Sequence, residues 1–577
     1  MNSKQYFSAF NSRTASRFAF LFSVLLAVAA CGGGGLTPTT DVRTSASGVR
    51  ALPASFTTRP AVNYSPYRTA TSDAGLASEI ITDANVEQDL RLVVAAGIGV
   101  IRLFDSTEKV ATTTLRVIRA KNLPLKVQLG IYVQVGEDNF TRDQMARGVA
   151  LANIYRDIVD TVSVGNENMV YWSANLVATK VMASYITYVR SQITQPITSD
   201  DNWAFYANAP KELLDTLDFV SMHSYVMVDT HYDDAKWDWR QTSLPESQRA
   251  AAMMDGALQA TKADYNLVRS YLDSKGFSHL PITIGETGWK AVDSSGADWY
   301  KFRANPVNQK MYYDRLQNWA KEGRNGVGPK AIFWFEAFDE QWKQSDDKWG
   351  LFNKDRQARC AIQALNPPSS VWVLESGNCA EATAAYYKPP VLNAAVTETR
   401  YLIYTETTSS SDKFPIGLRW DPFAKTFWQP VTTTHAPSDG TQSYEIDPRP
   451  ETWGWGLLYQ SPDKVTENLS NFTQGSIRFS LKTSYAGKLE IGLQTSTQDA
   501  GSEEAFLQIE NGKYGCSYQT DWCQMVIPLA DFLSINPKLD LRYVTSRFML
   551  ADRFDITKNT LKAGLPKIYL DGVYWNR

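Results

Sequence analysis

Short runs of β-branched and apolar residues recur eight times between residues 60 and 365, and amphipathic segments lie between them. This alternation predicts parallel strands joined by helices, and eight repeats over about 300 residues have the number and length of a (β/α)8 barrel. A doubly wound open sheet is the alternative, but no glycine-rich phosphate loop follows the first run. We therefore predict an α/β fold, a (β/α)8 TIM barrel, with strands at 60–65, 100–105, 125–133, 161–167, 196–201, 219–225, 281–289 and 331–338.

Polar and charged residues stand at the carboxyl ends of these runs, which meet at one mouth of such a barrel. Glu167 ends the fourth run and Glu286 lies in the seventh, so we expect the two carboxylates to face each other. Glycoside hydrolysis uses such a pair: one carboxyl donates a proton to the leaving oxygen, and the other attacks the anomeric carbon or orients a water. A structural salt bridge is the alternative for either residue alone, but it explains both residues poorly.

Motifs along the barrel segment resemble glycoside hydrolase family 17, the β-1,3-glucanase family, in the expected order. They are VNYSPYR (62–68), IRLFD (101–105), VGNE (164–167), IGETGW (284–289), FEAFDEQWK (335–343) and WGLFN (349–353). The resemblance implies that Glu167 is the acid/base, that Glu286 is the nucleophile, and that a linear β-1,3-glucan such as laminarin is cleaved with retention. Glu340 and Lys343 match a Glu and a Lys that plant members carry near the cleft. The FEAFDE wording is closer to bacterial and fungal members, and fungal relatives include glucanosyltransferases.

Aromatic and polar side chains near the strand ends are candidates for contacts with sugar. We expect Trp289 to be a stacking platform, because it directly follows the nucleophile motif, and Asn166 to bond a sugar hydroxyl. Arg102 and Asp105 are expected to hold the mouth together by a salt bridge or hydrogen bonds, with His223 as a supporting partner. Plain packing is the alternative for several of the aromatic residues. The predicted substrate-binding residues are Asn63, Tyr64, Tyr132, Asn166, Trp203, Tyr225, Trp289, Trp334, Glu336, Glu340, Trp342 and Lys343.

The pattern changes after residue 365. Proline-rich stretches are typical of a linker, and from residue 395 short strands alternate without helices, which predicts a jelly-roll-like β-sandwich. This part resembles carbohydrate-binding modules of that architecture, which implies a glucan-binding surface formed by Trp428, Trp453, Trp455 and Trp522. A purely structural domain is the alternative. The predicted organisation is a catalytic barrel at 56–365, a linker at 366–394 and a β-sandwich at 395–577.

The beginning of the chain has the pattern of an export signal followed by a tether. Lys4, Arg13 and Arg17 precede an apolar run at 18–30, which is too short to span a membrane comfortably. Cys31 follows this run, and the string VAAC resembles a bacterial lipobox, in which the cysteine is lipidated after cleavage. An ordinary signal peptide with a chance cysteine is the alternative. We expect a lipoprotein signal peptide at 1–30, a tether at 31–55 and an exported bacterial lipoprotein at the outer membrane, the cell surface or the periplasm.

The other four cysteines form closely spaced pairs, which suggests the disulfides Cys360–Cys379 and Cys516–Cys523 in an exported protein. No Cys and His cluster has metal-ligand spacing, and the chain has only four His, so we expect neither a metal nor a cofactor. The net charge of −3 and the lack of a basic run argue against nucleic acid as a partner. The expected partners are a β-glucan and, through the lipid, a membrane, and we expect a monomer.

The leading hypothesis is a lipid-anchored, retaining endo-β-1,3-glucanase, and two alternatives remain open. A β-1,3-glucanosyltransferase would use the same barrel but would lengthen oligosaccharides. A non-catalytic glucan-binding lipoprotein would use the barrel only as a scaffold. The presence of both Glu167 and Glu286 argues against the last alternative, because a protein that only binds glucan does not need the pair.

Overall fold

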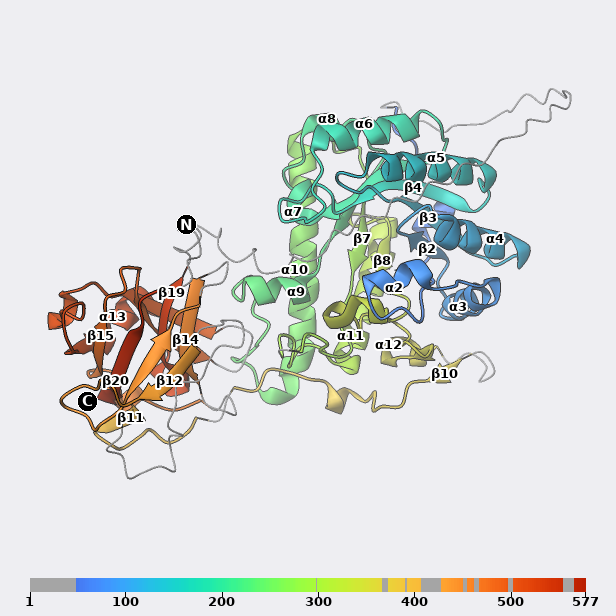
Figure 1. The fold of residues 1–577 in the computed structure, drawn as a ribbon. Helices are drawn as coiled ribbons and strands as arrows, with labels where there is room; N and C mark the ends of the chain where they lie inside the picture. Colours follow the sequence, from blue (N-terminus) through green and yellow to red (C-terminus); the bar gives the residue numbers. More distant parts are fainter. Residues whose placement is uncertain are drawn as a thin grey trace, which may run out of the picture. The chain divides into compact units, whose positions relative to one another are not determined.

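The structure is a computed structural model that describes residues 48–296, 298–365, 372–389, 392–405, 427–449, 454–460, 466–496, 502–553 and 565–577. The chain divides into two compact units, Met1–Tyr387 and Lys388–Arg577 (Figure 1). The predicted signal peptide, Cys31, most of the tether and Trp453 lie outside the described residues. The last part of the predicted tether is bound to the first unit, where the backbone N–H of Arg50 donates to Asp218 Oδ1 at 2.7 Å.

The first unit is built on a closed barrel of parallel strands, as the sequence predicts. Each strand pairs with the next, and β1 closes the ring by pairing with β8, with Ala61 opposite Phe333 and Val62 opposite Trp334. Nearly all strand residues are buried, because one face of each strand points into the barrel and the other lies under the helices. The strands are β1 Ala61–Asn63, β2 Val100–Leu103, β3 Lys126–Ile131, β4 Val159–Asn166, β5 Ile197–Asn202, β6 Val220–His223, β7 Ile282–Thr287 and β8 Ile332–Trp334.

Helices surround the strands of the barrel (Figure 1). Their apolar side chains pack with strand residues into one large hydrophobic core. The start of α11 shows how the sequence sets such an element: Asn305 accepts the backbone N–H of Val307 at 2.8 Å, and Pro306 occupies the first turn, where no N–H is needed. The helices are α1 Ala54–Thr57, α2 Asp73–Ser78, α3 Asp83–Ala95, α4 Thr113–Ala120, α5 Asp138–Ile154, α6 Thr179–Arg190, α7 Trp203–Tyr206, α8 Lys211–Leu214, α9 Val226–Tyr232, α10 Glu246–Ser274, α11 Pro306–Asn325 and α12 Cys360–Gln363.

The end of the first unit lies against the barrel. β10 Val373–Leu374 pairs in parallel with β9 Gln357–Ala358. The disulfide Cys360–Cys379 joins α12 to the segment after β10, with 5.4 Å between the Cα atoms. Further along, the side chain of Asn308 in α11 donates to the backbone of this segment at 2.9 Å. Part of the stretch for which the sequence predicts a linker is therefore bound to the barrel.

The second unit is a β-sandwich of two antiparallel sheets, which confirms the predicted fold class. One sheet has the order β12-β13-β20-β15-β18, with β11 beside β20, and the other has the order β14-β19-β16-β17. Phe479 and Trp575 belong to its hydrophobic core. Cys516 and Cys523 form a disulfide, so both disulfides are the pairs that the spacing predicts. The elements are β11 Arg400–Tyr404, β12 Phe427–Val431, β13 Ser443–Asp447, β14 Gly454–Gln460, β15 Ser476–Thr483, β16 Glu490–Ser496, β17 Ser502–Gln508, β18 Cys523–Pro528, α13 Leu529–Ile535, β19 Val544–Arg553 and β20 Ile568–Asn576.

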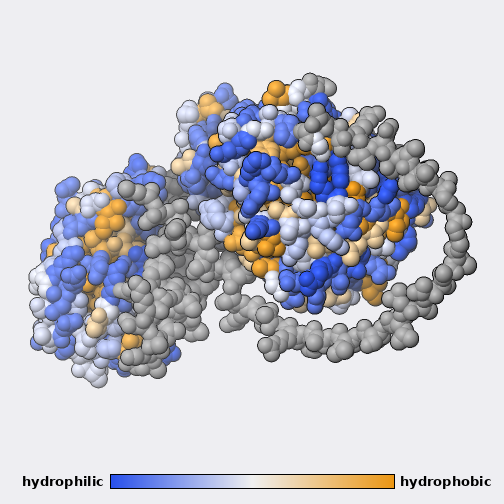
Figure 2. All heavy atoms as spheres, turned by 90° about the horizontal axis from the view of Figure 1, so that it is seen from above, coloured by the Kyte–Doolittle hydropathy of each residue, from blue (hydrophilic) through white to orange (hydrophobic). Residues whose placement is uncertain are grey.

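On the face drawn in Figure 2, hydrophilic and hydrophobic residues are interspersed over both units. Exposed apolar side chains such as Ile80 and Val327 are scattered over the first unit, as is normal for a protein surface. Within the described ranges, no helix is long and apolar enough to cross a membrane.

Candidate active site

Glu167 stands directly after β4, at the mouth of the barrel. Gly165 and Glu167 both have positive φ angles, 88° and 48°, so the chain turns sharply where the strand ends. A residue other than glycine in this region carries about 1–3 kcal/mol of strain and needs support from its surroundings. The backbone N–H of Glu167 donates to the backbone oxygen of Asp200 at 2.8 Å, while its side chain remains 35% exposed. The turn therefore presents a half-exposed carboxyl group at the mouth.

The loop that follows Glu167 is fixed by Asp201, a buried residue of β5. The carboxylate of Asp201 accepts the backbone N–H of Met169 at 2.7 Å and that of Val170 at 3.2 Å. Burial, followed by the negative charge of Glu167, raises the pKa of Asp201 to about 7. Asp201 thus ties the loop beside Glu167 to the neighbouring strand.

Glu286 lies in β7, where it is only 6% exposed. Its Oε1 accepts from the Arg102 guanidinium at 2.5 Å, and its Oε2 accepts from the Tyr225 hydroxyl at 2.6 Å. Burial by itself raises the pKa of Glu286, but His223, Arg102 and the Tyr225 hydroxyl outweigh burial and lower the pKa below its usual range. Glu286 is therefore an ionised carboxylate with a donor on each oxygen.

His223, at the end of β6, lies between the two glutamates. Its Nδ1 is 3.0 Å from Glu167 Oε1, and its Nε2 is 3.6 Å from Glu286 Oε1. Burial alone would lower the pKa of His223, but Glu286, Asp200 and Glu167 together raise it to about 10. The ring of His223 therefore lies within reach of both carboxyl groups, which the sequence predicts to face each other across the mouth.

Arg102 connects three of the polar groups at the mouth. In addition to Glu286, its Nε donates to Asp200 Oδ2 at 2.8 Å and its Nη2 donates to Asn166 Oδ1 at 2.6 Å. Arg102 and Asp105 are both expected to hold the mouth together, and their contacts show this for Arg102 but not for Asp105. Asp105 instead accepts the backbone N–H of Thr107 at 2.8 Å and its hydroxyl at 2.5 Å, within its own loop. Asp105 lies two residues beyond the end of β2, in a turn where it bonds the neighbouring Thr107 instead of a strand residue.

Glu336, Glu340 and Lys343 form a second charged cluster, in the segment after β8. Lys343 Nζ lies 2.8 Å from Glu336 Oε2 and 2.5 Å from Glu340 Oε2. The glutamates are only 2% and 3% exposed, so they have little surface to offer a sugar. In the part of the chain that the structure describes, neither this cluster nor any other group of three or more His, Cys, Asp or Glu is arranged to hold a metal ion.

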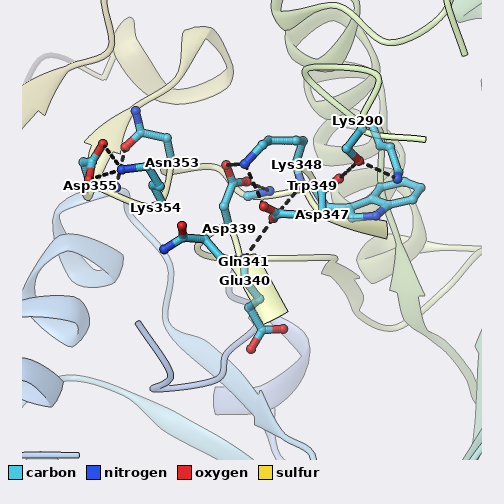
Figure 3. A network of polar contacts seen from close by, with 12 residues as sticks. Lys290, Asp339, Glu340, Gln341, Asp347, Lys348, Trp349, Asn353, Lys354 and Asp355 are labelled. Carbon is cyan, nitrogen blue, oxygen red and sulfur yellow. Dashed lines mark hydrogen bonds and ion pairs between the residues drawn. The ribbon is translucent and has the colours of Figure 1, made fainter. Parts of the chain in front are cut away.

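The segment that carries Glu340 is fixed by a network of polar contacts, shown in Figure 3. Asp347 Oδ1 accepts the backbone N–H of Glu340 at 3.0 Å, and Lys348 Nζ lies 2.7 Å from Asp347 Oδ2. Asp339 forms a two-pronged ion pair with Arg359, with oxygen to nitrogen distances of 2.8 and 2.6 Å. The carboxyl group of Glu340 points away from Asp347 in this view. The network thus fixes the backbone of Glu340, while the side chain of Glu340 pairs with Lys343.

Two tryptophans that we expect to contact sugar are buried instead. Trp289 is 0% exposed, and its indole N–H donates to the backbone oxygen of Arg303 at 2.8 Å. Trp334 is 1% exposed and donates to the backbone oxygen of Trp349 at 3.2 Å. The interpretation of both as sugar platforms is wrong, because an inaccessible ring with a satisfied N–H cannot stack on a ligand.

Asn63 and Tyr64 are also buried rather than open to substrate, with both residues 0% exposed. The Asn63 side chain donates to the backbone oxygen of Gly285 at 3.1 Å. The Tyr64 hydroxyl donates to Asp89 at 3.3 Å. Their prediction as substrate-binding residues is therefore wrong; Asn63 instead supports the backbone beside Glu286.

The predicted aromatic residues that retain accessible surface are Tyr132, Trp203, Tyr225 and Trp342. The sequence analysis missed another pair: Tyr171 is 76% exposed, and its ring meets that of Trp172 edge to face at 4.6 Å. This pair lies on the loop directly after Glu167. Two adjacent aromatic residues close after the VGNE motif were the signal that could have found them.

The predicted tryptophans of the β-sandwich are likewise partly buried and partly accessible. Trp455 is 0% exposed, and its indole N–H donates to the Tyr485 hydroxyl at 2.9 Å, so its assignment to a binding surface is wrong. Trp428 and Trp522 are half-buried. The ring of Trp522 lies 6.5 Å from that of Tyr569. Of the three predicted tryptophans that the structure describes in this unit, Trp428 and Trp522 are the two that retain accessible surface.

Comparison with known families shows what kind of domain holds this site. The profile of the BtgE/BtgC glycoside hydrolase domain matches residues 61–351, about half of the chain, including every strand of the barrel. The chain belongs to this family. The barrel of this BtgE/BtgC family member is therefore a glycoside hydrolase domain, and the two carboxyl groups lie at its mouth. A second profile, carbohydrate binding domain 30, matches residues 422–575 in the β-sandwich.

Individual proteins are similar to this BtgE/BtgC family member over different lengths. Glucan 1,3-beta-glucosidase of Arthroderma benhamiae is 24% identical over 291 residues, which are 48% of this chain and 83% of the relative. An endo-laminarinase from Formosa Hel1_33_131 of known crystal structure is 26% identical, with a TM-score of 0.48, over 53% of this chain and 85% of that one. The Delta(12)-acyl-lipid-desaturase of Punica granatum is 24% identical over 106 residues, 18% of this chain, and the chain spans only 26% of its length.

Proposed function

We propose that this protein hydrolyses β-1,3-glucan with retention of configuration, as an endo-acting enzyme in which Glu286 is the nucleophile and Glu167 the acid/base. The observation that carries the proposal is the position of the His223 ring, which lies against both carboxyl groups, whereas Arg102 and Tyr225 contact Glu286 and not Glu167. The substrate is supported by the name of the Arthroderma benhamiae relative and by the motifs that resemble glycoside hydrolase family 17.

In the first half of the reaction, an oxygen of Glu286 attacks the anomeric carbon and the bond to the leaving sugar breaks. Glu286 suits this role because its lowered pKa keeps it ionised at neutral pH. Arg102 and Tyr225 hold different oxygens of the carboxylate and so fix its orientation. The product of this half is a glycosyl ester on Glu286.

Glu167 moves the proton in both halves. It protonates the leaving oxygen first, and it then takes a proton from the water that hydrolyses the ester. Its partial exposure gives it access to both the sugar and the water. Beside it, Asn166 Oδ1 is engaged by Arg102, so the amide N–H groups of Asn166 are the ones available to a sugar hydroxyl.

Product analysis tests this proposal. The chain from Gly48 to Arg577 is incubated with laminarin, with a β-1,4-glucan and a β-1,6-glucan as controls. We expect short β-1,3-oligosaccharides from laminarin alone, which first appear as β-anomers in the NMR spectrum. Initial α-anomers would overturn retention, and oligosaccharides longer than those supplied would identify a glucanosyltransferase. Binding of laminarin without any product would identify a non-catalytic glucan-binding protein.

We also propose that the β-sandwich binds glucan. The match to carbohydrate binding domain 30 supports this role, and Trp428 and Trp522 supply half-buried rings. Replacing both by Ala in the full chain should reduce pull-down by insoluble curdlan at least about tenfold, because stacking of sugar on aromatic rings is lost. Turnover of short oligosaccharides should not change. Wild-type pull-down by the double variant would favour a purely structural domain.

Export and lipid anchoring form a separate proposal. The apolar run at 18–30, the VAAC string and the two disulfides support it, since disulfides persist in oxidising compartments. Cells that express the full chain should incorporate labelled palmitate into it, and the Cys31→Ala variant should not. Equal labelling of both chains would place the lipid elsewhere.

A further inference from the structure

Asp200 is a fully buried carboxylate in β5, below the two glutamates of the proposed mechanism, and it has no role of its own in that mechanism. It accepts from Arg102 Nε at 2.8 Å, from Gln128 Nε2 at 3.0 Å and from the hydroxyl of Ser221. His223 Nε2 lies 3.8 Å from its Oδ1. The seat of this carboxylate is therefore built by side chains from β2, β3 and β6.

β7 completes the surroundings of the Asp200 carboxylate, because a glycine on this strand leaves space for it. A Cβ atom on Gly285 would lie only 2.5 Å from Asp200 Oδ1, closer than real Cβ atoms approach an oxygen. Gly285 immediately precedes Glu286 in the nucleophile motif, so the glycine of that motif accommodates the Asp200 carboxylate. Because Asp200 is 0% exposed, it reaches the reaction only through Arg102 and His223.

The charges around Asp200 balance. Arg102 and His223 are cations, and Asp200 and Glu286 are anions, so the four cancel when Glu167 carries its proton. Burial opposes ionisation of Asp200, but Arg102 and His223 outweigh it and hold its pKa well below the usual range.

Three further titratable groups face this cluster: Tyr206, Asp201 and Tyr225. Burial together with Glu286 raises the pKa of the Tyr225 phenol well above its usual value, so that it is neutral. The Tyr206 phenol is neutral, because burial and then Asp201 raise its pKa well above the usual value. Asp201 is the neighbour on β5, with a pKa of about 7, so it is largely neutral in mildly acidic solution. In mildly acidic solution, where Asp201 carries its proton, the count of two cations and two anions therefore stands.

We propose that Asp200 is a positioning residue whose fixed negative charge keeps the site neutral both before and after the sugar is transferred to Glu286. This inference rests on the proposed function. Before transfer, Glu286 is an anion and Glu167 carries the proton. When the Glu286–sugar bond forms, the proton of Glu167 leaves with the departing oxygen, so Glu286 becomes a neutral ester and Glu167 an anion.

The sum of charges is zero in both states only if Asp200 remains ionised. Without it, one uncompensated positive charge would stay in a site of low dielectric through the whole reaction. That charge would favour the ionised form of Glu167, and the enzyme would lose its acid at a lower pH. Asp200 thus acts on the proton of Glu167 without touching it.

Asp200→Asn tests the proposal, because it keeps the shape of the side chain and replaces its negative charge by a neutral amide. The alkaline limb of the kcat/KM profile on laminarin should move to lower pH by about 1–2 units. The matched control is Ser221→Ala, which removes a hydrogen bond to Asp200 but leaves its charge, and its alkaline limb should stay within a few tenths of a unit. If the alkaline limb of the Asp200→Asn profile lies at the same pH as in the wild type, the proposal is overturned, however slow the variant is. A purely structural role of Asp200 would lower activity without moving the profile.

A measurement on the wild-type protein decides the matter if Asp200→Asn does not fold. With ¹⁵N-labelled histidine, NMR should show both ring nitrogens of His223 protonated from pH 5 to 8, in the free enzyme and in the enzyme trapped with a 2-deoxy-2-fluoro glycoside. Loss of that proton in either state breaks the charge count and overturns the proposal. A wild-type protein with no glycosidase activity would instead refute the proposed function, which is a distinguishable result.

Discussion

Two pairs of glutamates near the barrel mouth differ in the number of cationic side chains that contact them. The pair Glu167 and Glu286 shares the imidazolium of His223, and Glu286 also has Arg102. The pair Glu336 and Glu340 has Lys343. In the first pair the buried member, Glu286, has a lowered pKa. In the second pair the two members diverge.

The pKa of Glu336 lies well above its usual value, because burial and the neighbouring Glu340 outweigh Lys343, whereas the pKa of Glu340 is lowered by Lys343 despite burial. Glu336 Oε1 and Glu340 Oε1 are both buried and find no donor within the described part of the chain. One proton between these two oxygens would satisfy both. In the second pair, one cation therefore stabilises one buried glutamate as an anion and leaves the other with a raised pKa.

The largest effect is expected for Glu286→Ala, because this variant removes the proposed nucleophile, which Arg102 and His223 keep ionised. Activity on laminarin should fall at least about 10⁴-fold while laminarin is still bound. Azide should restore part of the turnover and yield a glycosyl azide of inverted configuration, which NMR detects. Turnover within tenfold of wild type would remove Glu286 from its proposed role.

Glu167→Ala should have a smaller effect that depends on the leaving group. Hydrolysis of laminarin should fall by about 10²–10⁴-fold, since a sugar alkoxide needs a proton to leave. Dinitrophenyl β-laminaribioside has a leaving group that needs no such proton. Transfer of its sugar to the enzyme should therefore still be fast, and a burst of dinitrophenol should precede slow turnover. Equal losses on both substrates, measured by stopped-flow absorbance, would contradict the acid/base assignment.

The sequence predicts the barrel and the positions of Glu167 and Glu286 because both follow from local pattern. Short apolar runs that alternate with amphipathic helical segments favour buried parallel strands, and the carboxyl ends of the strands of a (β/α)8 barrel share one mouth. The same argument fails for Trp289 and Trp334. A residue at or just beyond a strand end can turn toward the core or toward the mouth, and only the packing of α11 and its neighbours decides which.

The ionisation states of the residues at the site also could not be predicted from the sequence. Asp200 and Asp201 are adjacent in β5, yet the pKa of Asp200 lies well below its usual range while that of Asp201 is about 7. Their side chains leave the strand on opposite faces, as successive residues do, so Asp200 meets Arg102 and Asp201 meets backbone N–H groups. No motif in a single sequence records which partners a strand residue meets.

Lys343→Met tests the second pair by removing its cation. Both glutamates would then have to be neutral in the fold, so we expect a loss of about 3–5 kcal/mol at pH 8 and a smaller loss at pH 5. Chemical denaturation at the two pH values measures it. The matched control is Lys310→Met, which breaks the more exposed ion pair with Asp314 and should cost less than about 1 kcal/mol at either pH. A loss that does not depend on pH would mean that Glu336 and Glu340 do not titrate with Lys343.

The smallest effect is expected for Glu336→Gln. It has the opposite sign, because this variant should raise the free energy of unfolding instead of lowering it. Glu336 keeps its proton in the fold and loses it in the unfolded chain above pH 4.5, so folding takes up a proton and the wild-type free energy of unfolding falls as pH rises. Glutamine needs no proton, so the variant should gain on the wild type by up to about 1.4 kcal/mol per pH unit above that value.

Glu340→Gln is the control for this prediction, because the lowered pKa of Glu340 stabilises the fold above pH 4.5 and that stabilisation is lost as pH falls. Its replacement should therefore destabilise the protein near neutral pH. Denaturation curves of both variants and the wild type at pH 5, 6 and 7 give the two slopes. If both variants lose stability equally at every pH, the pair does not share a proton, and the contrast with Glu167 and Glu286 then rests on burial alone.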